Sequence, residues 1–278
     1  MWSKTLLNRG TSARSMAKSS GTGTSDEPNA VTHRAPAVSR AATVLRLLAG
    51  ERSGLGVTEI ARRVGLVPST CLHVLRALVD EGFITFDADT KTYRTGVGLL
   101  TLVRDAMASN DFRKAAQPTL ERLAASFHVT AVGVELDSRE RMVVVALARS
   151  DSLISLHVNV GSRFPSLISA TGRCVAAASG LSREELQQKF EELRWERAPR
   201  FEDWYAEVER AKAEGVAIDR SNYIRGLTIA AALLPAGFDR VTRGIALVGF
   251  EHNLPERITR QIKDDLAESV RALAAQLS

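Results

Sequence analysis

Cysteine is scarce in this chain of 278 residues, in which Cys71 and Cys174 are the two thiols. They lie far apart in the sequence, so their spacing predicts neither a disulfide framework nor a zinc site and favours a reducing compartment. Long apolar runs are lacking as well, since none approaches the roughly 18 uninterrupted residues that a membrane helix needs. With 45% hydrophobic and 25% charged residues, the composition is that of an ordinary soluble protein. We expect a cytoplasmic protein that has no membrane segment.

The motifs that identify common enzyme classes are missing too. The sequence has no HExxH pair, no phosphate-binding glycine loop and no dinucleotide fingerprint. Side chains that resemble parts of a hydrolase are present, but none lies in a nucleophile-elbow sequence: Ser166, Ser169, His128, His157 and Asp219. The sequence therefore predicts no catalysis, no cofactor and no metal site. An enzyme that acts on a small acid is the alternative from another class.

The net charge of +5 lies in the first third of the chain. Residues 1–36 hold five Lys and Arg against two acids, residues 37–95 hold eight against six, and residues 96–278 hold 24 of each. The excess is therefore +3, +2 and zero in these segments. A basic N-terminal third predicts a polyanionic partner.

Residues 1–36 are rich in Ser, Thr, Gly and Ala and show no apolar period. This composition predicts a disordered basic tail. Because it is rich in Arg and Ser and poor in acids, it also resembles an organellar transit peptide. A solvated tail, a start assigned too early with Met16 as a later start, and a basic arm that contacts DNA phosphates are the other interpretations.

The stretch VTEIARRVGLVPSTCLHVLRALVDE, residues 57–81, predicts two short helices joined by a tight turn. Gly65 permits the left-handed backbone that ends the first helix, and Pro68 suits the first turn of the second. In the second helix an apolar stripe is expected to face a core. The stripe comprises Leu72, Leu75 and Val79.

Another face of this second helix carries donors and acceptors at the reach of base edges and phosphates. Its candidate residues are Ser69, Thr70, His73 and Arg76. On this stretch alone, DNA binding and the ordinary packing of two helices are both open, because helical hairpins are common.

The preceding segment adds a third helix. An apolar period predicts a helix over Val38–Ala49, with Ser39 placed to cap it. Arg40 lies in its first turn, where a cation is unfavourable for the helix dipole. Phosphate contact is one explanation for Arg40, and a solvated side chain is the other.

The following segment predicts a β-hairpin. Residues 83–95, FITFDADTKTYRT, place a turn-rich stretch between two β-prone ones, with Lys91 and Arg94 in or beside the turn. Three helices and a hairpin form a winged helix-turn-helix domain, which we assign to residues 37–95. Lys91 and Arg94 are then candidates for phosphate or minor-groove contact. This combination favours DNA binding far more than the helical pair alone.

Residues 96–110 predict a linker helix. Apolar side chains dominate Val97–Ala108, and the segment has little polar surface. Because winged helices commonly read paired half-sites through a two-fold protein, dimer contact is one interpretation. Packing onto the chain's own second domain is the other.

Residues 111–278 predict an α/β (α+β) domain in which strands are followed by helices and then by strands again. This order suggests a mainly antiparallel sheet with helices on its faces, and such a domain commonly encloses one small-molecule pocket. The expected elements are helix Phe112–Phe127; strands Thr130–Glu135, Met142–Ala148 and Leu153–Val160; helices Ala170–Ser179, Arg183–Leu193 and Glu202–Glu214; strands Leu227–Leu234 and Gly244–Phe250; and helix Pro255–Leu277.

Segments of both domains resemble the isocitrate lyase regulator (IclR) family of bacterial transcription factors. In the first domain they are SRAATVLRLLAG, VTEIARRVGLVPSTCLHVLRALVDEGFI and YRTGVGLLTL; in the second, GSRFPSLISATGRCVAA and GVAIDRSNYIRGLTIAAALLP. The resemblance covers roughly residues 37–275, in the family's domain order. It implies a GAF-like effector-binding domain, a homodimer or homotetramer on an inverted-repeat DNA operator, and repression or activation controlled by a small metabolite.

The resemblance also implies where the effector lies. In the family it sits against backbone amides in the segment that matches Ala170–Thr171–Gly172, and free N–H groups at a helix start attract a carboxylate. Asp219 matches an acidic residue that hydrogen-bonds the ligand in part of the family; capping a turn is its alternative role. The apolar walls, equally explicable as core residues, are Leu153, Leu156, Phe164, Leu227, Ile229, Ala246 and Val248.

The chain departs from the family at two places. Residues 220–222, Arg-Ser-Asn, follow Asp219 where many relatives carry paired acids. Ala246 and Val248 stand where the members with the smallest ligands place hydroxyls. Both changes disfavour glyoxylate and favour a larger, partly apolar acid, either aromatic or aliphatic. The effector, the operator and the sign of regulation stay open, as does a DNA-binding dimer that needs no ligand.

Overall fold

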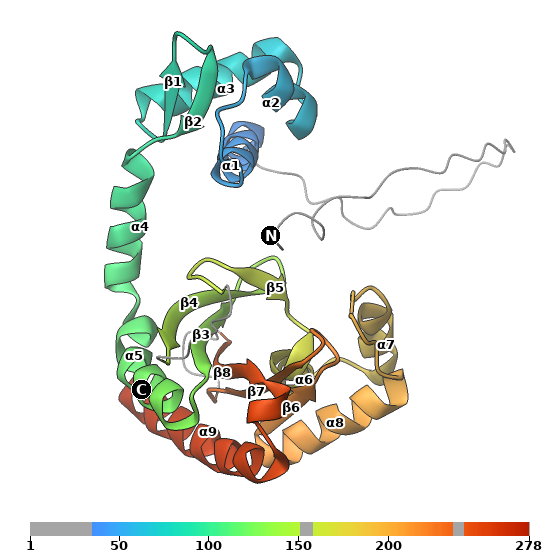
Figure 1. Ribbon diagram of the computed structural model, residues 1–278. Helices are drawn as coiled ribbons and strands as arrows, with labels where there is room; N and C mark the ends of the chain where they lie inside the picture. The colour runs from blue at the N-terminus through green and yellow to red at the C-terminus, as the bar shows by residue number, and fades with distance from the viewer. Residues whose placement is uncertain (1–34, 151–157, 236–241, 278) are drawn as a thin grey trace, which may run out of the picture. The chain divides into compact units, whose positions relative to one another are not determined.

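The computed structural model describes residues 35–150, 158–235 and 242–277, and the chain divides into two compact units at Val97 and Gly98 (Figure 1). Each unit is described by itself. The tail predicted for residues 1–36 lies outside the described residues except at its end, where Pro36 belongs to the first helix. Among the described residues, no helix is both long enough and apolar enough to cross a membrane.

The first unit has three helices followed by a two-stranded wing. The wing strands pair antiparallel from Ile84 opposite Thr95 to Asp87 opposite Thr92. Leu55, in the loop after the first helix, adds a bridge to Tyr93 through two backbone hydrogen bonds of 3.1 and 2.8 Å. The winged helix-turn-helix prediction is therefore confirmed in its elements: α1 Pro36–Ala49, α2 Val57–Val64, α3 Pro68–Asp80, β1 Ile84–Asp87 and β2 Thr92–Thr95.

Helix α1 begins earlier than its predicted cap. Pro36 occupies the first turn, where a missing N–H costs nothing, so the helix starts three residues before Ser39. Ser39 lies inside the helix, and its carbonyl accepts a hydrogen bond of 2.8 Å from Thr43 Oγ1. The prediction that Ser39 caps this helix was wrong, because the proline starts the helix without a side-chain cap.

The core of the first unit lies along one stripe of α3, which is rotated from the predicted one. Cys71, Leu75 and Leu78 are buried there, together with Ile60 of α2. Leu75 was predicted correctly. The other two predicted members differ, since Val79 and Leu72 are only half-buried. Cys71 is fully buried and its Sγ lies 3.9 Å from Val57 O of α2, so the buried stripe centres on Cys71 and Leu75.

The second unit is built on one antiparallel sheet with the strand order β5-β4-β3-β8-β7-β6. The sheet is covered by helices on both faces, so β3 and β7 are buried almost along their whole length. The fold class predicted for this domain is confirmed. Its elements are α4 Gly98–Ser109, α5 Asp111–Phe127, β3 Thr130–Leu136, β4 Arg141–Arg149, β5 Arg163–Pro165, α6 Ser169–Ser179, α7 Arg183–Glu191, α8 Phe201–Glu214, β6 Val216–Arg220, β7 Leu227–Leu233, β8 Arg243–Phe250, a 3-10 turn Glu251–Asn253 and α9 Glu256–Leu277.

The two faces of the sheet carry separate apolar cores. Alternate residues of each strand point to opposite faces, so Ala230 and Ala232 of β7 pack with α5 and α9, whereas Ile229 and Ala231 pack with α6, α7 and α8. In Figure 1 α9 runs along one side of the sheet and α8 passes the end that carries β6. This division places the start of α6 over the Ile229 face.

Two strands were not predicted, and one predicted strand is not seen as such. The prediction of a strand over Leu153–Val160 falls mostly outside the described residues, and residues 158–160, which are described, form no strand. The unpredicted strands are β5, with three residues, and β6. In β6 the inward-facing Asp219 breaks the apolar alternation that would have marked a strand.

Candidate functional site

Helix α3 presents a polar face to solvent. Ser69, His73 and Arg76 are exposed and follow each other at spacings of four and three along the helix, while Thr70 beside them is half-buried. The side chains of Ser69, His73 and Arg76 make no hydrogen bond or ion pair with the described residues. They are therefore free to contact base edges, as predicted for this face.

The turn before α3 fixes the position of this face. Gly65 ends α2 with a φ of 69°, in the left-handed region that its missing side chain permits. Pro68 then starts α3, and no side chain caps that helix or adds an acid to its first turn. The free N–H groups and the helix dipole make the α3 start favourable for a phosphate. The predicted roles of Gly65 and Pro68 are confirmed.

The wing turn is held by Asp87. Its Oδ1 accepts hydrogen bonds from the backbone N–H groups of Asp89 at 3.0 Å and Thr90 at 3.1 Å. These bonds, the one from Thr90 above all, lower the pKa of the Asp87 carboxyl. Lys91 stands exposed in this turn with a φ of 52°, and Arg94 is exposed on β2. Both predicted wing cations are thus available to a ligand.

The cations of the first unit fall into two groups. On α2, Arg62 lies 2.7 Å from Glu59, and Arg63 lies 2.8 Å from Glu51. Hydrogen bonds from Arg62 and Arg63 lower the pKa of Glu59 to about 2. By contrast, Arg40 is exposed on α1 and makes no ion pair with the described residues, and the same holds for Arg76. Arg40 and Arg76 are therefore cations without an ion-pair partner among the described residues, whereas the α2 cations are neutralised.

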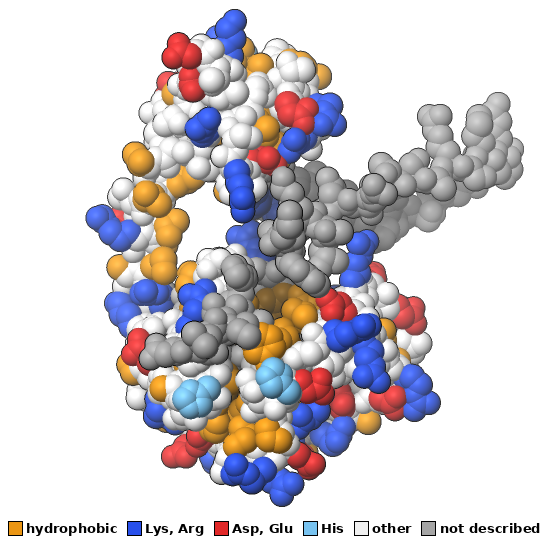
Figure 2. Space-filling view, viewed as in Figure 1, with side chains coloured by type: hydrophobic (Ala, Val, Ile, Leu, Met, Phe, Trp, Pro, Cys, Tyr) orange, Lys and Arg blue, Asp and Glu red, His pale blue; other side chains and the backbone are white. Residues whose placement is uncertain are grey.

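Helix α4 has an uncovered apolar surface. None of its residues is buried by the described residues. Leu100 is 69% exposed, Leu102 and Val103 are both more than half exposed, and Val97 just before the helix is 78% exposed. Figure 2 shows hydrophobic side chains along the part of the chain that forms α4. The described residues of the second unit leave this surface uncovered, and both dimer contact and packing onto the second domain stay predictions.

The start of α6 has the features of an anion-binding helix terminus. Ser169 opens the helix with a φ of 64°, and Ala170 and Thr171 behind it are buried. Ser169 is only 3% exposed, and its Oγ has no hydrogen-bond partner among the described residues. No side chain caps the helix and no acid lies in its first turn. The N–H groups of this turn have no intrahelical acceptor.

Gly172 makes this turn possible. A Cβ at this position would lie 1.9 Å from the backbone carbonyl carbon of Leu167, far inside van der Waals contact. The Gly172 N–H donates to Ile168 O at 2.8 Å, which closes the first turn of α6. The residue therefore lets the segment before α6 pass directly against the helix.

The sheet face opposite α6 carries the predicted apolar side chains, together with Asp219 and Thr130. Ile229 of β7 pairs with Val248 of β8, and Ala246 lies two residues earlier on β8, with its side chain on the same face. Ile229 and Ala246 are buried, Val248 is half-buried, and all three belong to the apolar core under α6. Leu227, also buried, shares the face of Ile229 by strand alternation, and half-buried Phe164 of β5 packs onto the same core.

Two predicted wall residues, Leu153 and Leu156, lie outside the described residues. Of the described ones, Phe164, Ile229, Ala246 and Val248 share one apolar core with Ala170 of α6. Their role in binding an effector stays a prediction, because the same contacts are those of an ordinary core.

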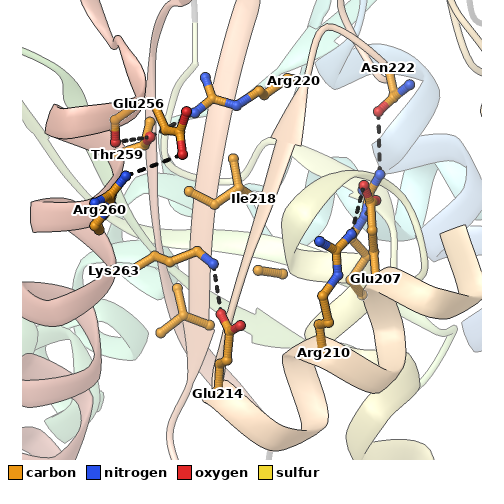
Figure 3. Close-up of a pocket in the computed structure, with 13 residues that line it drawn as sticks. Glu207, Arg210, Glu214, Ile218, Arg220, Asn222, Glu256, Thr259, Arg260 and Lys263 are labelled. Atoms are coloured by element: carbon orange, nitrogen blue, oxygen red, sulfur yellow. Dashed lines mark hydrogen bonds and ion pairs between the residues drawn. The ribbon is translucent and has the colours of Figure 1, made fainter. Parts of the chain in front are cut away.

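A separate pocket of about 500 Å³ opens at the β6 edge of the sheet, between α8 and α9 (Figure 3). None of the described residues predicted for the effector lines it. Its wall is mostly charged and polar, and its lining residues are Arg173, Glu207, Arg210, Glu214, Val216, Ala217, Ile218, Arg220, Asn222, Glu256, Thr259, Arg260 and Lys263. Sequence reasoning missed this site, because its residues come from four segments that share no motif.

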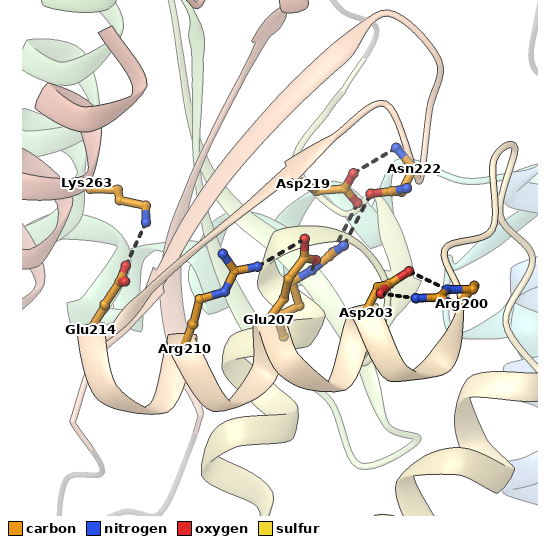
Figure 4. A network of polar contacts seen from close by, with 9 residues as sticks. Arg200, Asp203, Glu207, Arg210, Glu214, Asp219, Asn222 and Lys263 are labelled. Carbon is orange, nitrogen blue, oxygen red and sulfur yellow. Dashed lines mark hydrogen bonds and ion pairs between the residues drawn. The ribbon is translucent and has the colours of Figure 1, made fainter. Parts of the chain in front are cut away.

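Asp219 is engaged by partners within the protein. Its Oδ2 accepts a hydrogen bond from Nη1 of buried Arg173 at 3.3 Å, and its Oδ1 accepts one from the Asn222 N–H at 2.9 Å. Arg173 also contacts Glu207 of α8, which lies near Asn222 and Asp219 in Figure 4. Burial raises the pKa of the Asp219 carboxyl, and the Arg173 charge opposes that rise. Asp219 thus caps the turn after β6, and its contact with an effector stays a prediction.

The hydrolase-like side chains are not joined to one another. His128 is exposed at the end of α5, where its φ of 53° closes the helix. Ser166, Ser169 and Asp219 are buried, and among the described residues no hydrogen bond links any two of these four side chains. His157 lies outside the described residues.

Comparisons with known proteins match both units. The family description "IclR helix-turn-helix domain" matches residues 37–88, and "Bacterial transcriptional regulator IclR C-terminal" matches residues 104–278. The glycerol operon regulatory protein of Streptomyces coelicolor is 27% identical over 242 residues, which are 86% of this chain and 93% of that protein. The Pca regulon regulatory protein of Pseudomonas putida is 26% identical over 51% of this chain and 48% of its own length.

Solved structures show the same architecture. An IclR transcriptional regulator from Alicyclobacillus acidocaldarius superposes with a TM-score of 0.76 at 25% identity, covering 87% of this chain and 99% of that one. An IclR homolog from Microbacterium hydrocarbonoxydans superposes with a TM-score of 0.69 at 21% identity, covering 87% and 98%. The relatives by sequence are transcriptional regulators. With a helix-turn-helix match and a C-terminal match that covers more than half of its residues, the chain belongs to the IclR family of bacterial transcriptional regulators.

Proposed function

We propose that this regulator is a dimer that reads an inverted-repeat operator and changes its operator affinity when its C-terminal unit binds a partly apolar organic acid. The single observation that carries the DNA part is the exposed face of α3, where His73 and Arg76 have no partner among the described residues. Arg76 reads a base edge in this proposal, with Ser69, Thr70 and His73 beside it. Arg40, Lys91 and Arg94 hold phosphates and set the register.

The effector part rests on the start of α6. A carboxylate there accepts hydrogen bonds from the N–H groups of Ala170 and Thr171, and the Ser169 hydroxyl, which lacks a protein partner, donates another. The rest of the ligand lies on the Ile229 and Val248 face of the sheet. Apart from Asp219 and Thr130, which pair with Ile229 and Val248, the named side chains of that face are apolar, so a larger acid with an apolar body fits it better than glyoxylate.

A relative with the same fold supports this ligand class. The IclR homolog from Microbacterium hydrocarbonoxydans was solved in complex with 4-hydroxybenzoate, an aromatic acid. At 21% identity that similarity concerns the fold alone, so the ligand of the present chain is a proposal. A cytoplasmic location follows from the proposed work on DNA.

The link between the two sites is helix α4, which is continuous in sequence with both units. In our proposal its uncovered apolar side chains, Leu100 and Val103 among them, contact a second copy. Effector binding then stabilises one arrangement of the dimer over another. The factor by which the effector changes the operator affinity equals the factor by which the operator changes the effector affinity.

Two experiments test this function. Sequencing the genomic DNA retained by the purified protein should return an inverted repeat, and a gel shift on that repeat should change when the right acid is added. In a thermal-shift screen, aromatic and longer aliphatic acids should raise the melting temperature while glyoxylate and pyruvate do not. The reverse ranking contradicts the ligand class. Specific DNA binding with a featureless screen favours the ligand-independent dimer, and turnover of an acid favours an enzyme.

A further inference from the structure

The pocket at the β6 edge has cations on three sides. Helix α8 contributes Arg210, strand β6 contributes Arg220, and α9 contributes Arg260 and Lys263. Figure 3 shows the α9 side chains along one side of the pocket and those of α8 along the other, with Ile218 between them. Arg173 of α6 adds a fifth cation from within the fold. Against these stand three glutamates, Glu207, Glu214 and Glu256, so the lining has a net charge of +2.

The ion pairs of this lining leave charge available to a ligand. Arg260 lies 3.3 Å from Glu256, and both side chains are exposed, at 72% and 82%. Arg210 lies 3.6 Å from Glu207, which Arg173 also holds. Exposed pairs of this kind contribute little to stability. An incoming anion therefore recruits these guanidinium groups at small cost.

Among the cations of the pocket, Arg220 is bonded to neutral acceptors. Its Nη2 donates to Thr259 Oγ1 at 2.7 Å and its Nη1 donates to Leu254 O at 3.4 Å. Both acceptors are neutral, and the described residues give Arg220 no carboxylate partner. These two bonds hold the guanidinium at the pocket wall beside the start of α9. A guanidinium fixed in this way presents its remaining N–H groups to a carboxylate or phosphate.

The backbone of β6 adds further donors. Strand β6 is the last of its sheet, so one of its edges has no neighbouring strand. The Ser221 N–H donates to Leu227 O of β7, and in an antiparallel ladder such pairs alternate along the strand. The N–H groups of Ile218 and Arg220 therefore point away from β7, toward the pocket that these residues line. Backbone donors and guanidinium groups converge on one space.

We propose that this pocket is a second ligand site, separate from the α6 start, and that it takes a small polyanion with two or more carboxylate or phosphate groups. Its volume of about 500 Å³ lies within the roughly 300–1,000 Å³ of small-molecule sites. The cations on α8, β6 and α9 are spread along the pocket, which suits several anionic groups better than one. The apolar floor is limited to Val216, Ala217 and Ile218, so a mainly apolar ligand gains little there.

Arg173 connects this pocket to the start of α6. Arg173 lines this pocket and is fully buried, and it lies two residues after Thr171 on α6. Its guanidinium is shared among Glu207, Asp219 and Asn222. A polyanion that draws Arg210 away from Glu207 changes the set of charges around Arg173. Binding of the polyanion thus affects the α6 start through one side chain, that of Arg173.

Isothermal titration calorimetry of the full-length protein tests the proposal with citrate and with inorganic pyrophosphate, each at physiological ionic strength. Acetate at matched ionic strength is the monovalent control. Saturable binding of citrate, of pyrophosphate or of both is the expected result, and the difference between them shows whether the site prefers carboxylates or phosphates. Arg260→Gln and Arg220→Gln should each weaken that binding at least tenfold.

Matched variants distinguish binding at this pocket from a general effect of the protein's positive charge. Arg271→Gln removes an exposed charge from the same helix outside the pocket, and it should leave the affinity unchanged. With the described residues Arg260 makes no hydrogen bond or ion pair beyond that with Glu256, so Arg260→Gln keeps the fold even where Arg220→Gln loosens α9. No saturable heat with either polyanion overturns the proposal, as does equal weakening by Arg271→Gln and Arg260→Gln. A change in sedimentation on Arg260→Gln without polyanion binding also overturns it and assigns the pocket to a second copy.

Discussion

The guanidinium of Arg173 donates to the carboxylate of Asp219 across 3.3 Å, and both side chains are buried. Removing one partner of a buried pair costs about 3–5 kcal/mol when the other charge is left uncompensated; Arg173 keeps Glu207, so the loss lies at the lower end of this range. We therefore expect Asp219→Ala to lower the free energy of unfolding by an amount of this order. Urea denaturation followed by tryptophan fluorescence measures it.

The double variant Arg173→Met, Asp219→Leu provides the comparison. Because it removes both charges, it should be less destabilised than the sum of the two single variants, and the difference is the coupling energy of the pair. Additive effects would show that Asp219 acts independently of Arg173. Loss of effector binding without loss of stability in Asp219→Ala would instead support the ligand contact predicted from the sequence.

Helices α2 and α3 show which structural features can be predicted from a sequence. Gly65 and Pro68 mark the ends of two helices through backbone preferences that act locally, and such preferences are visible in a single chain. The stripe on α3 was placed less well, because the buried set Cys71, Leu75 and Leu78 has the same helical spacings as the predicted one, so periodicity alone does not separate the two. Ser39 failed as a cap for a related reason, since Pro36 competes for the same helix start.

The second unit shows which structural features cannot be predicted from a sequence. Asp219 in β6 reads as a turn or surface residue because its buried partner, Arg173, lies 46 residues earlier. The pocket at the β6 edge depends in the same way on α6, α8 and α9 meeting one strand. Long-range charge pairing carries no periodic signal, so neither feature was predicted, whereas the apolar face with Ile229 and Val248 was found through its resemblance to a family.

Arg76 on α3 is the sharpest test of DNA reading. If it makes a bidentate base contact, Arg76→Ala should weaken specific operator binding by about 1–3 kcal/mol and relax selectivity at one base pair. Because the side chain is exposed and has no partner among the described residues, the melting temperature should not change. Gel-shift titrations against operator and scrambled DNA measure both effects.

Arg52→Ala is the control for Arg76, since Arg52 is an exposed arginine in the loop between α1 and α2. Its removal lowers the charge of the same unit equally but should leave discrimination intact. Unchanged discrimination in Arg76→Ala would remove that residue from base recognition.

Gly172 supports the proposed effector turn. The added Cβ of Gly172→Ala would lie 1.9 Å from the Leu167 carbonyl carbon, so the backbone must move, and overpacking of this kind costs about 1–3 kcal/mol or more. Calorimetry should show a lower melting temperature, and the shift induced by the effector should disappear. Gly50→Ala is the matched substitution, because Gly50 has a φ of −84° and its Cβ would meet Leu47 O at 3.5 Å. A melting temperature that is equal in both variants would contradict the tight turn.

The two thiols should be inert in the native protein. Burial raises the pKa of the Cys174 thiol to about 12 and also raises that of Cys71. Because only the thiolate reacts with an aromatic disulfide reagent, we expect no labelling of the folded chain at pH 8 and labelling of both residues in denaturant. For Cys174 the reactive form gains population only as the pH approaches 12. Rapid labelling of one thiol at pH 8 would show that its helix opens.

Leu100 tests whether α4 forms the contact between copies. It is 69% exposed, so Leu100→Lys should leave the fold of one chain intact, yet a lysine buried between two chains without a partner is costly. We expect dissociation at least tenfold stronger than in the native protein, measured by sedimentation equilibrium. Asp105→Lys is the control, since Asp105 lies on the opposite side of α4 and is also exposed. Unchanged assembly in Leu100→Lys would assign the contact to another surface, and a step from tetramer to dimer would place Leu100 between two dimers.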